Sequence, residues 1–257
     1  QTKSIIIDMK RLFLFLLTNL VVVATVSLIL SLLGLGPILT QRGIDYQTLM
    51  VWCFTWGMAG ACISLLLSRI VAKSLMGVRL IQKSDPLYAR VERLATSCGL
   101  PETPQVGIFE SSSLNAFATG PSKRRSLVAL SSALVNRMGD DELDAVIAHE
   151  LSHIASGDMV TMTLLQGVIN AFVMFLARVL AFAIAGASRN RNGRSSYASQ
   201  IALTYLFEIV FMVCGMLIIA AFSRWREFKA DRGGARITHP GAMVAALQHL
   251  QTAHTRI

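Results

Sequence analysis

Four long stretches of this sequence carry almost no charge, and they restrict the fold more than any other feature does. They cover residues 12–33, 49–70, 159–187 and 201–222. Each is long enough to cross about 30 Å of hydrocarbon as a helix that rises about 1.5 Å per residue. The chain is 53% hydrophobic and 15% charged, whereas soluble domains carry about 25% charged residues. The sequence therefore predicts an α-helical integral membrane protein with about four hydrophobic helices.

Basic residues indicate which side of the membrane the polar segments occupy. Lys10 and Arg11 precede the first stretch, residues 69–83 follow the second with four basic side chains, and residues 224–236 follow the fourth with five. Positive charge near span ends favours the cytoplasm, so all three segments are expected there. Residues 189–194, between the third and fourth stretches, are basic too and would lie outside if both stretches crossed. The pair makes either two crossings or none, so both of its flanks stay on one side of the membrane. The net charge of +9 is interpreted as charge that orients the spans and contacts anionic lipid, not as charge that binds nucleic acid.

His149-Glu150-Leu151-Ser152-His153 is the most specific chemical motif of the chain. Two histidines four residues apart on a helix project from one face, and their imidazoles can bind one Zn²⁺. Glu150 adjoins the first histidine and can take a proton from a water molecule that attacks a peptide bond. Gly139–Glu142 suits the start of a helix and Gly157 its end, so we expect a helix over residues 140–156. A surface helix with two hydrogen-bonded histidines is the alternative.

A catalytic zinc needs three protein ligands and an open position for water. Glu227, in the segment Arg224–Asp231, is the candidate for the third ligand. Asp231 lies four residues later on the same helical face, and we expect its carboxylate to accept the second N–H of His149 and so orient the ring. An even number of crossings separates His153 from Glu227, so the two can meet on one side of the membrane. A solvated charged turn after a span is the alternative.

The region between the second and third stretches is expected to be a small α+β domain. It contains an amphipathic helix over residues 86–98 and short strands over residues 105–109, 114–119 and 127–130. A sheet ahead of the histidine helix can offer an edge strand to which an extended substrate adds. Asn115 is a candidate substrate contact, although a plain turn explains its segment equally well.

Three charged residues lie at or inside the later hydrophobic stretches. Asp158 is expected to cap the helix of the third span rather than to take part in catalysis. Arg178 and Glu208 carry opposite charges and lie within hydrophobic stretches that are predicted to enter the membrane, where ionised groups are costly unless they have partners. We therefore predict an ion pair between Arg178 and Glu208.

Together these segments resemble the HtpX family of bacterial membrane zinc endopeptidases, which is related to the CAAX prenyl endopeptidases. The resemblance rests on Ala148–Asp158 (AHELSHIASGD), on the hydrophobic pair that follows and on Arg226–Asp231 (REFKAD). It extends from Met9 over nearly the whole chain, through residues 13–20, 114–120 and 157–162. It implies bound zinc, a cytoplasmic active site and proteolysis of misfolded membrane proteins under envelope stress. It also implies His149, His153 and Glu227 as ligands, with Glu150 as the general base.

The resemblance thus implies a multi-pass zinc metalloendopeptidase of the bacterial inner membrane with a cytoplasmic zincin-type α+β domain. Its expected partners are unfolded or misfolded membrane proteins, the lipid bilayer and other membrane quality-control proteases. The family usually carries a His-Pro-Pro segment near its C-terminus, which is not found before Ile257. A catalytically impaired scaffold or binder that keeps the zinc fold is therefore the alternative.

The expected organisation has five parts. They are an N-terminal extension over residues 1–11, a transmembrane hairpin over 12–70 with spans 12–33 and 49–70, a cytoplasmic zinc-protease domain over 71–158, a second hydrophobic hairpin over 159–222, and a cytoplasmic segment over 223–257 that carries the third ligand.

Overall fold

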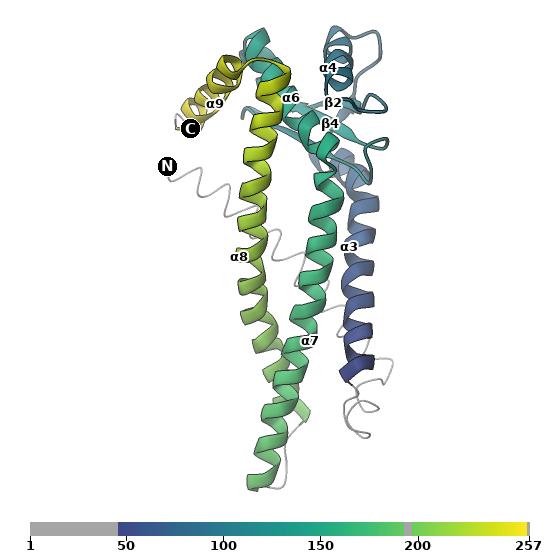
Figure 1. Cartoon of the computed structure of the whole chain (residues 1–257), viewed down its shortest axis with the longest axis vertical. Coiled ribbons are helices and arrows are strands. Elements are labelled where there is room, and N and C mark those ends of the chain that lie inside the picture. Colours follow the sequence, from purple (N-terminus) through teal and green to yellow (C-terminus); the bar gives the residue numbers. More distant parts are fainter. Residues whose placement is uncertain (1–45, 193–196, 256–257) are drawn as a thin grey trace. The chain divides into compact units, whose positions relative to one another are not determined.

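The computed structural model describes residues 46–192 and 197–255 (Figure 1). Within these residues, three helices are long and apolar enough to cross a membrane: α3 (Tyr46–Met76), α7 (Asp158–Asn192) and α8 (Tyr197–Ile237). They contain the predicted stretches 49–70, 159–187 and 201–222. The predicted extension 1–11 and the predicted first span 12–33 lie outside the described residues. A helical membrane protein with a small mixed sheet is confirmed as the fold class.

Helix α8 runs without a break from the last hydrophobic stretch into the segment that carries Glu227. Its 41 residues span about 60 Å at about 1.5 Å per residue, roughly twice the thickness of a hydrocarbon core. Only part of α8 can therefore lie in hydrocarbon, and its C-terminal part must emerge from the bilayer.

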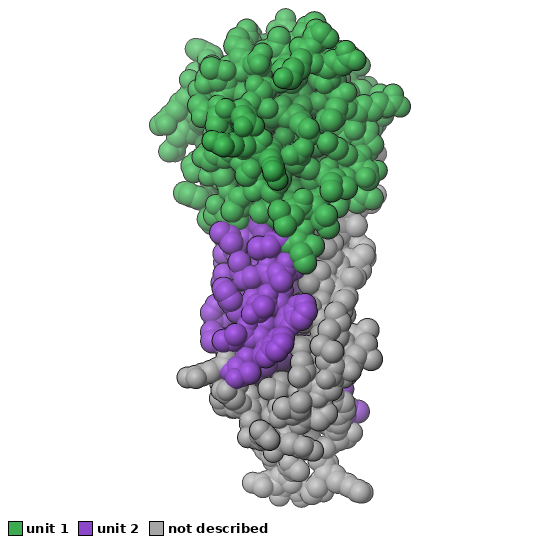
Figure 2. All heavy atoms as spheres, turned by 90° about the vertical axis from the view of Figure 1, so that its right-hand side faces the viewer, with its two compact units in different colours: residues 1–10, 63–162, 222–257 green, residues 11–62, 163–221 purple. Residues whose placement is uncertain are grey.

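The chain divides into two compact units, which Figure 2 distinguishes by colour. Among the described residues, unit 1 comprises residues 63–162 and 222–255, and unit 2 comprises residues 46–62, 163–192 and 197–221. The histidine motif and Glu227 both belong to unit 1, although the hydrophobic pair of unit 2 separates them in the sequence. Unit 1 is therefore assembled from segments that lie far apart along the chain.

Unit 1 contains a four-stranded sheet in the order β1-β2-β4-β3. Its strands are β1 (Arg79–Leu80), β2 (Gln105–Phe109), β3 (Ala116–Thr119) and β4 (Leu127–Ser131). The three longer strands agree with the predicted ones to within two residues, and β1 was not predicted. Strand β4 pairs in parallel with β2 and antiparallel with β3. Strand β3 is thus an edge strand.

Four further helices complete unit 1. They are α4 (Pro86–Ser97), α5 (Ser132–Arg137), α6 (Asp140–Ser156) and α9 (Pro240–Thr255). Helix α6 packs against β3, α4 and α9, and its bounds are those that the sequence predicted. A buried apolar cluster joins these elements and includes Val91, Leu130, Leu134, Ile147, Leu151 and Met243. Helix α6 is therefore the central element of unit 1.

Polar contacts hold the start of α6, and a glycine in a left-handed conformation ends it. The Glu142 carboxylate accepts the main-chain N–H of Gly139 at 3.2 Å, and it also pairs with His249 Nδ1 of α9 at 2.8 Å. Gly157 ends the helix in the left-handed region, with φ of 70°. This conformation favours glycine because it has no Cβ.

Small residues let the helices of unit 2 approach closely. A Cβ on Gly57 of α3 would lie 2.8 Å from the Gly167 carbonyl oxygen and 2.9 Å from the Ala171 nitrogen of α7. Small residues serve this purpose in membrane helix packing, where backbone proximity replaces the hydrophobic effect. Arg178 of α7 and Glu208 of α8 form the predicted ion pair, with 2.9 Å between Nη1 and Oε1. Glu208 is only 4% exposed.

We expect the Glu208→Leu variant to lose about 3–5 kcal/mol of stability, because it leaves the Arg178 charge buried without its carboxylate. The double variant Arg178→Met/Glu208→Leu should regain most of that loss. A double-mutant cycle on unfolding in detergent measures the coupling. Strictly additive losses would contradict the pairing.

Candidate metal centre

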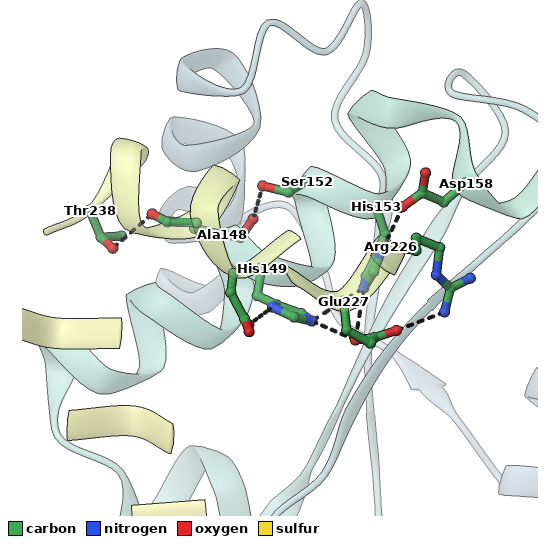
Figure 3. Close-up of polar contacts among 10 residues, drawn as sticks. Ala148, His149, Ser152, His153, Asp158, Arg226, Glu227 and Thr238 are labelled. Atoms are coloured by element: carbon green, nitrogen blue, oxygen red, sulfur yellow. Dashed lines mark hydrogen bonds and ion pairs between the residues drawn. The ribbon is translucent and has the colours of Figure 1, made fainter. Parts of the chain in front are cut away.

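Three side chains from two helices converge at one point in unit 1 (Figure 3). His149 and His153 project from α6, and their Nε2 atoms lie 3.2 Å apart. Glu227 reaches them from α8, with its Oε2 atom 3.3 Å from His149 Nε2 and 3.5 Å from His153 Nε2. The structure thus brings together the three residues that the sequence predicted as ligands.

The spacing of these three atoms suits a tetrahedral metal ion. Zinc binds histidine nitrogen and carboxylate oxygen at about 2.0–2.2 Å, so two ligands of a tetrahedral site lie about 3.3–3.5 Å apart. The three measured separations are 3.2, 3.3 and 3.5 Å. Since the set consists of three protein ligands, a fourth position remains for water or substrate.

Each histidine is oriented by a carboxylate on its other ring nitrogen. His149 Nδ1 lies 2.9 Å from Asp231 Oδ1, and His153 Nδ1 lies 2.8 Å from Asp158 Oδ2. A carboxylate accepts the Nδ1 proton, so each Nε2 presents its lone pair to the metal position. Asp231 thus contacts His149, the histidine that we expected it to orient from the sequence.

Asp158 was interpreted wrongly from the sequence. It is the first residue of α7 rather than the residue before that helix, and its buried carboxylate holds His153. The turn at Gly157, with φ of 70°, brings Asp158 back toward the end of α6. The signal that could have identified it is the rule that a ligating histidine has a carboxylate partner.

The charges of the centre reinforce one another. Burial lowers the pKa of His149, but hydrogen bonds with the Asp231 and Glu227 carboxylates outweigh burial and raise that pKa to about 10. Hydrogen bonds from the same two histidines, together with Arg226, hold the pKa of Glu227 well below its usual range. Arg226 Nη2 lies 2.9 Å from Glu227 Oε1, which leaves Oε2 for the metal position. Glu227 is therefore an anion at neutral pH.

Glu150 lies beside these three residues and faces the sheet. Burial raises the pKa of Glu150, while the charges of His149 and His153 and a hydrogen bond with the main chain of Ala118 act in the opposite direction. Ala118 belongs to the edge strand β3. A carboxylate with a raised pKa next to a metal position suits the exchange of protons with a reacting water molecule.

Asn115 lies immediately before β3, three residues from Ala118. Its main-chain N–H donates to Ser131 Oγ at 3.0 Å, and its carbonyl accepts the Ser131 N–H at 2.8 Å. These contacts anchor the start of the edge strand. A contact between the Asn115 side chain and substrate stays a prediction.

Two consecutive glycines let α8 approach α6 closely, and the sequence analysis missed them. A Cβ on Gly233 would lie 2.6 Å from Ser152 Oγ, and one on Gly234 would lie 3.1 Å from the His149 nitrogen and 2.4 Å from Met243 Cε. Glycine inside a helix costs about 1 kcal/mol relative to alanine. A pair of glycines in α8 is therefore a signal of close packing, which here brings Glu227 to the histidines.

Comparisons with known proteins identify the relatives of this chain. Residues 82–255 match the sequence profile of peptidase family M48. A protease HtpX homolog of Bacillus subtilis is 45% identical over 261 residues, which cover 96% of this chain and 87% of that protein. Protease HtpX of Acinetobacter baylyi is 43% identical over 251 residues, or 95% of this chain and 83% of that protein.

A solved structure shows the same fold. The crystal structure of S. mikatae Ste24p superposes with a TM-score of 0.58 at 21% sequence identity. The match covers 91% of this chain, and this chain spans 58% of that protein.

We expect the Asp158→Asn variant to bind metal about 10–100-fold more weakly, because a neutral amide replaces the charged acceptor that fixes the His153 ring and raises its basicity. Zinc affinity measured with a competing chelator tests this. Asp141→Asn is the matched control, since Asp141 is exposed on the first turn of the same helix. Equal affinities for the two variants would contradict the assigned role of Asp158.

Zinc affinity should rise with pH in the neutral range. A pKa of about 10 means that His149 is protonated in the metal-free protein at pH 7, and the metal must displace that proton. Apparent affinity should then rise about tenfold per pH unit between about pH 6.5 and about pH 8. The Asp231→Asn variant removes the negative charge beside His149 Nδ1, lowers the pKa of His149 and should flatten this dependence. An equally steep dependence in the variant would contradict the view that the proton on His149 causes the pH dependence.

Proposed function

This chain belongs to peptidase family M48 and is a membrane metalloprotease, and we propose that zinc is its metal and unfolded membrane proteins are its substrates. We further propose that it acts at the cytoplasmic face of the bacterial inner membrane, alongside other quality-control proteases. The convergence of His149, His153 and Glu227, with Glu150 beside them, carries this proposal.

Zinc is the metal that this donor set favours. Two imidazole nitrogens and one carboxylate oxygen at tetrahedral spacing are typical of catalytic zinc, whereas magnesium and calcium prefer six or more oxygen ligands. Zinc in this position supplies a Lewis acid that polarises a carbonyl and makes an attacking water molecule more acidic. The carboxylates of Asp231 and Asp158 keep both imidazoles aligned during the reaction.

Glu150 acts as the proton carrier in this proposal. It takes a proton from the water molecule as the new C–O bond forms, and it passes that proton to the amine nitrogen as the C–N bond breaks. Burial raises the pKa of Glu150, which makes its carboxylate a stronger proton acceptor. Because water attacks directly, no bond forms between substrate and protein.

Strand β3 is the proposed docking element for substrate. The main chain of Asn115 bonds to Ser131, and Phe117 and Thr119 continue that register along β4. Bonding groups alternate along an antiparallel strand, so Ala116 and Ala118 face the edge away from β4. The Ala118 N–H already donates to Glu150 there, which leaves the main-chain groups of Ala116 and the Ala118 carbonyl for substrate. An extended substrate can add there by main-chain hydrogen bonds, with Asn115 at its end.

This mode of binding supports the proposed substrate class. Main-chain hydrogen bonds do not depend on sequence, but they require a segment that has lost its own secondary structure. The site also lies close to the membrane along the chain, since Glu227 follows the apolar stretch 201–222 by five residues. Unfolded segments of membrane proteins meet both conditions.

The distribution of basic residues supports a cytoplasmic site. Unit 1 carries the basic residues that follow the second stretch, residues 69–83, and those that follow the fourth, residues 224–236. Positive segments close to span ends stay in the cytoplasm.

The Glu150→Gln variant tests the catalytic proposal. It should bind zinc like the wild type and lose about 10²–10⁴-fold in the cleavage rate of an unfolded protein in detergent, because the proton carrier is absent. Glu92→Gln on α4 is a control, since Glu92 is exposed and Glu92→Gln removes the same charge. Zinc content is measured on the same samples.

The outcomes separate the protease from the scaffold alternative. If only the Glu150→Gln variant is inactive, the protease proposal stands. If wild type and both variants hold zinc and none cleaves, this chain is a binder that retains the zinc fold.

A further inference from the structure

A groove of about 810 Å³ lies on unit 1, between the C-terminal part of α8 and the ends of α6 and α4. Lys229, Arg232 and Arg236 of α8 line it, and none of the described residues that line it is acidic. We propose that this groove binds the headgroup of an anionic phospholipid from the bilayer leaflet where α8 leaves the hydrocarbon. This inference is independent of peptide cleavage.

The basic side chains share one face of α8. Trp225, Lys229, Arg232 and Arg236 follow one another at spacings of four, three and four residues, which places them in one row along a helix. Glu227 and Asp231 leave the same helix toward the histidines of α6. Helix α8 therefore presents Glu227 and Asp231 to the metal centre and Lys229, Arg232 and Arg236 to the groove.

Two exposed aromatic side chains line the groove, and among its lining residues on α8 they are nearest in sequence to the apolar stretch 201–222. Trp225 is 57% exposed and Phe228 is 65% exposed, although both are large and apolar. Aromatic rings of this kind concentrate at the membrane interface, where one part contacts acyl chains and another contacts headgroups. Since the apolar stretch 201–222 ends three residues before Trp225, Trp225 lies about 5 Å along the helix axis beyond the end of that stretch.

Helix geometry directs the basic groups back toward that interface. Side chains on a helix tilt toward its N-terminus, and the apolar stretch 201–222 lies on the N-terminal side of this part of α8. The Lys229 Nζ atom accordingly lies 5.7 Å from the centre of the Trp225 ring. Arg232 follows on the same row and is exposed. A phosphate near Lys229 and Arg232 would thus have its acyl chains against Trp225 and Phe228.

Helix α6 supplies the opposite wall. Ser156 lines the groove with an exposed hydroxyl group, whereas the buried Ser152 hydroxyl donates to the Ala148 carbonyl at 2.8 Å and packs against Gly233. Guanidinium, ammonium and hydroxyl groups are the usual donors to phosphate. Aromatic rings, a basic row and a hydroxyl group in one groove match an anionic phospholipid better than a free phosphate. A free phosphate has no apolar part that could contact the rings.

The test uses the full chain, purified in detergent and freed of lipid. It is titrated with dioctanoyl phosphatidylglycerol, and bound lipid is counted by native mass spectrometry. Lys229→Gln/Arg232→Gln should bind this lipid about 30-fold more weakly, because each basic residue near a membrane contributes about fivefold. Arg124→Gln/Arg125→Gln removes the same charge from an exposed turn and should bind like the wild type.

Three further arms identify the ligand and its position. Dioctanoyl phosphatidylcholine, which has the same chains without net charge, should bind weakly, and inorganic phosphate should bind weakly because it lacks chains. Trp225→Phe should retain the lipid but lose the change in tryptophan fluorescence that accompanies binding. Zinc content of every variant reports folding, and the single variants Lys229→Gln and Arg232→Gln replace the double variant if it loses zinc. Equal binding of phosphatidylcholine or phosphate, or undiminished binding by the Lys229 and Arg232 variants, would overturn the proposal.

Discussion

The close crossing of α8 over α6 is the contact on which the metal centre depends. The two histidines lie on α6 and their anionic partner lies on α8, so the ligand set exists only where the helices meet. Gly233 and Gly234 permit that meeting, because a Cβ at either position would run into Ser152 or into His149 and Met243. The helical cost of two glycines, about 1 kcal/mol each, is offset by the packing and by the centre that it assembles.

The carboxylates around the centre explain how it tolerates so much charge in a small volume. Asp231 and Asp158 each hold one histidine, and Arg226 holds the second oxygen of Glu227. Every charged group thus has a partner of opposite sign, which partly buried charges require. These contacts also leave the Nε2 atoms and one Glu227 oxygen free to face a common point. Glu150 is the group that burial pushes toward its neutral form, which separates its role from that of the ligands.

One continuous helix performs three tasks at different depths. Within unit 2, α8 packs against α7 and pairs Glu208 with Arg178. Beyond the apolar stretch it presents Glu227 to the histidines on one face and a basic row to the proposed lipid groove on another. These tasks coexist because helical periodicity separates faces, while a rise of about 1.5 Å per residue separates depths. A change that shifts α8 along its axis would therefore disturb the metal centre as well as the membrane contacts.

The amino-acid sequence alone was enough to identify the hydrophobic helices, the histidine helix with its bounds, and Glu227 and Asp231 as candidates. Those features are local, because helix period, capping and hydropathy act over a few residues. The roles of Asp158 and of the two glycines were missed, because the sequence carries signals for them but not the contacts that give those signals a meaning. The position of Asp158 depends on a left-handed turn, and the need for glycine at 233 and 234 arises from α6, which lies about 80 residues earlier. The sequence determined which groups could bind a metal, and only the tertiary structure decided which of them meet, because contacts between distant segments depend on how backbones pack.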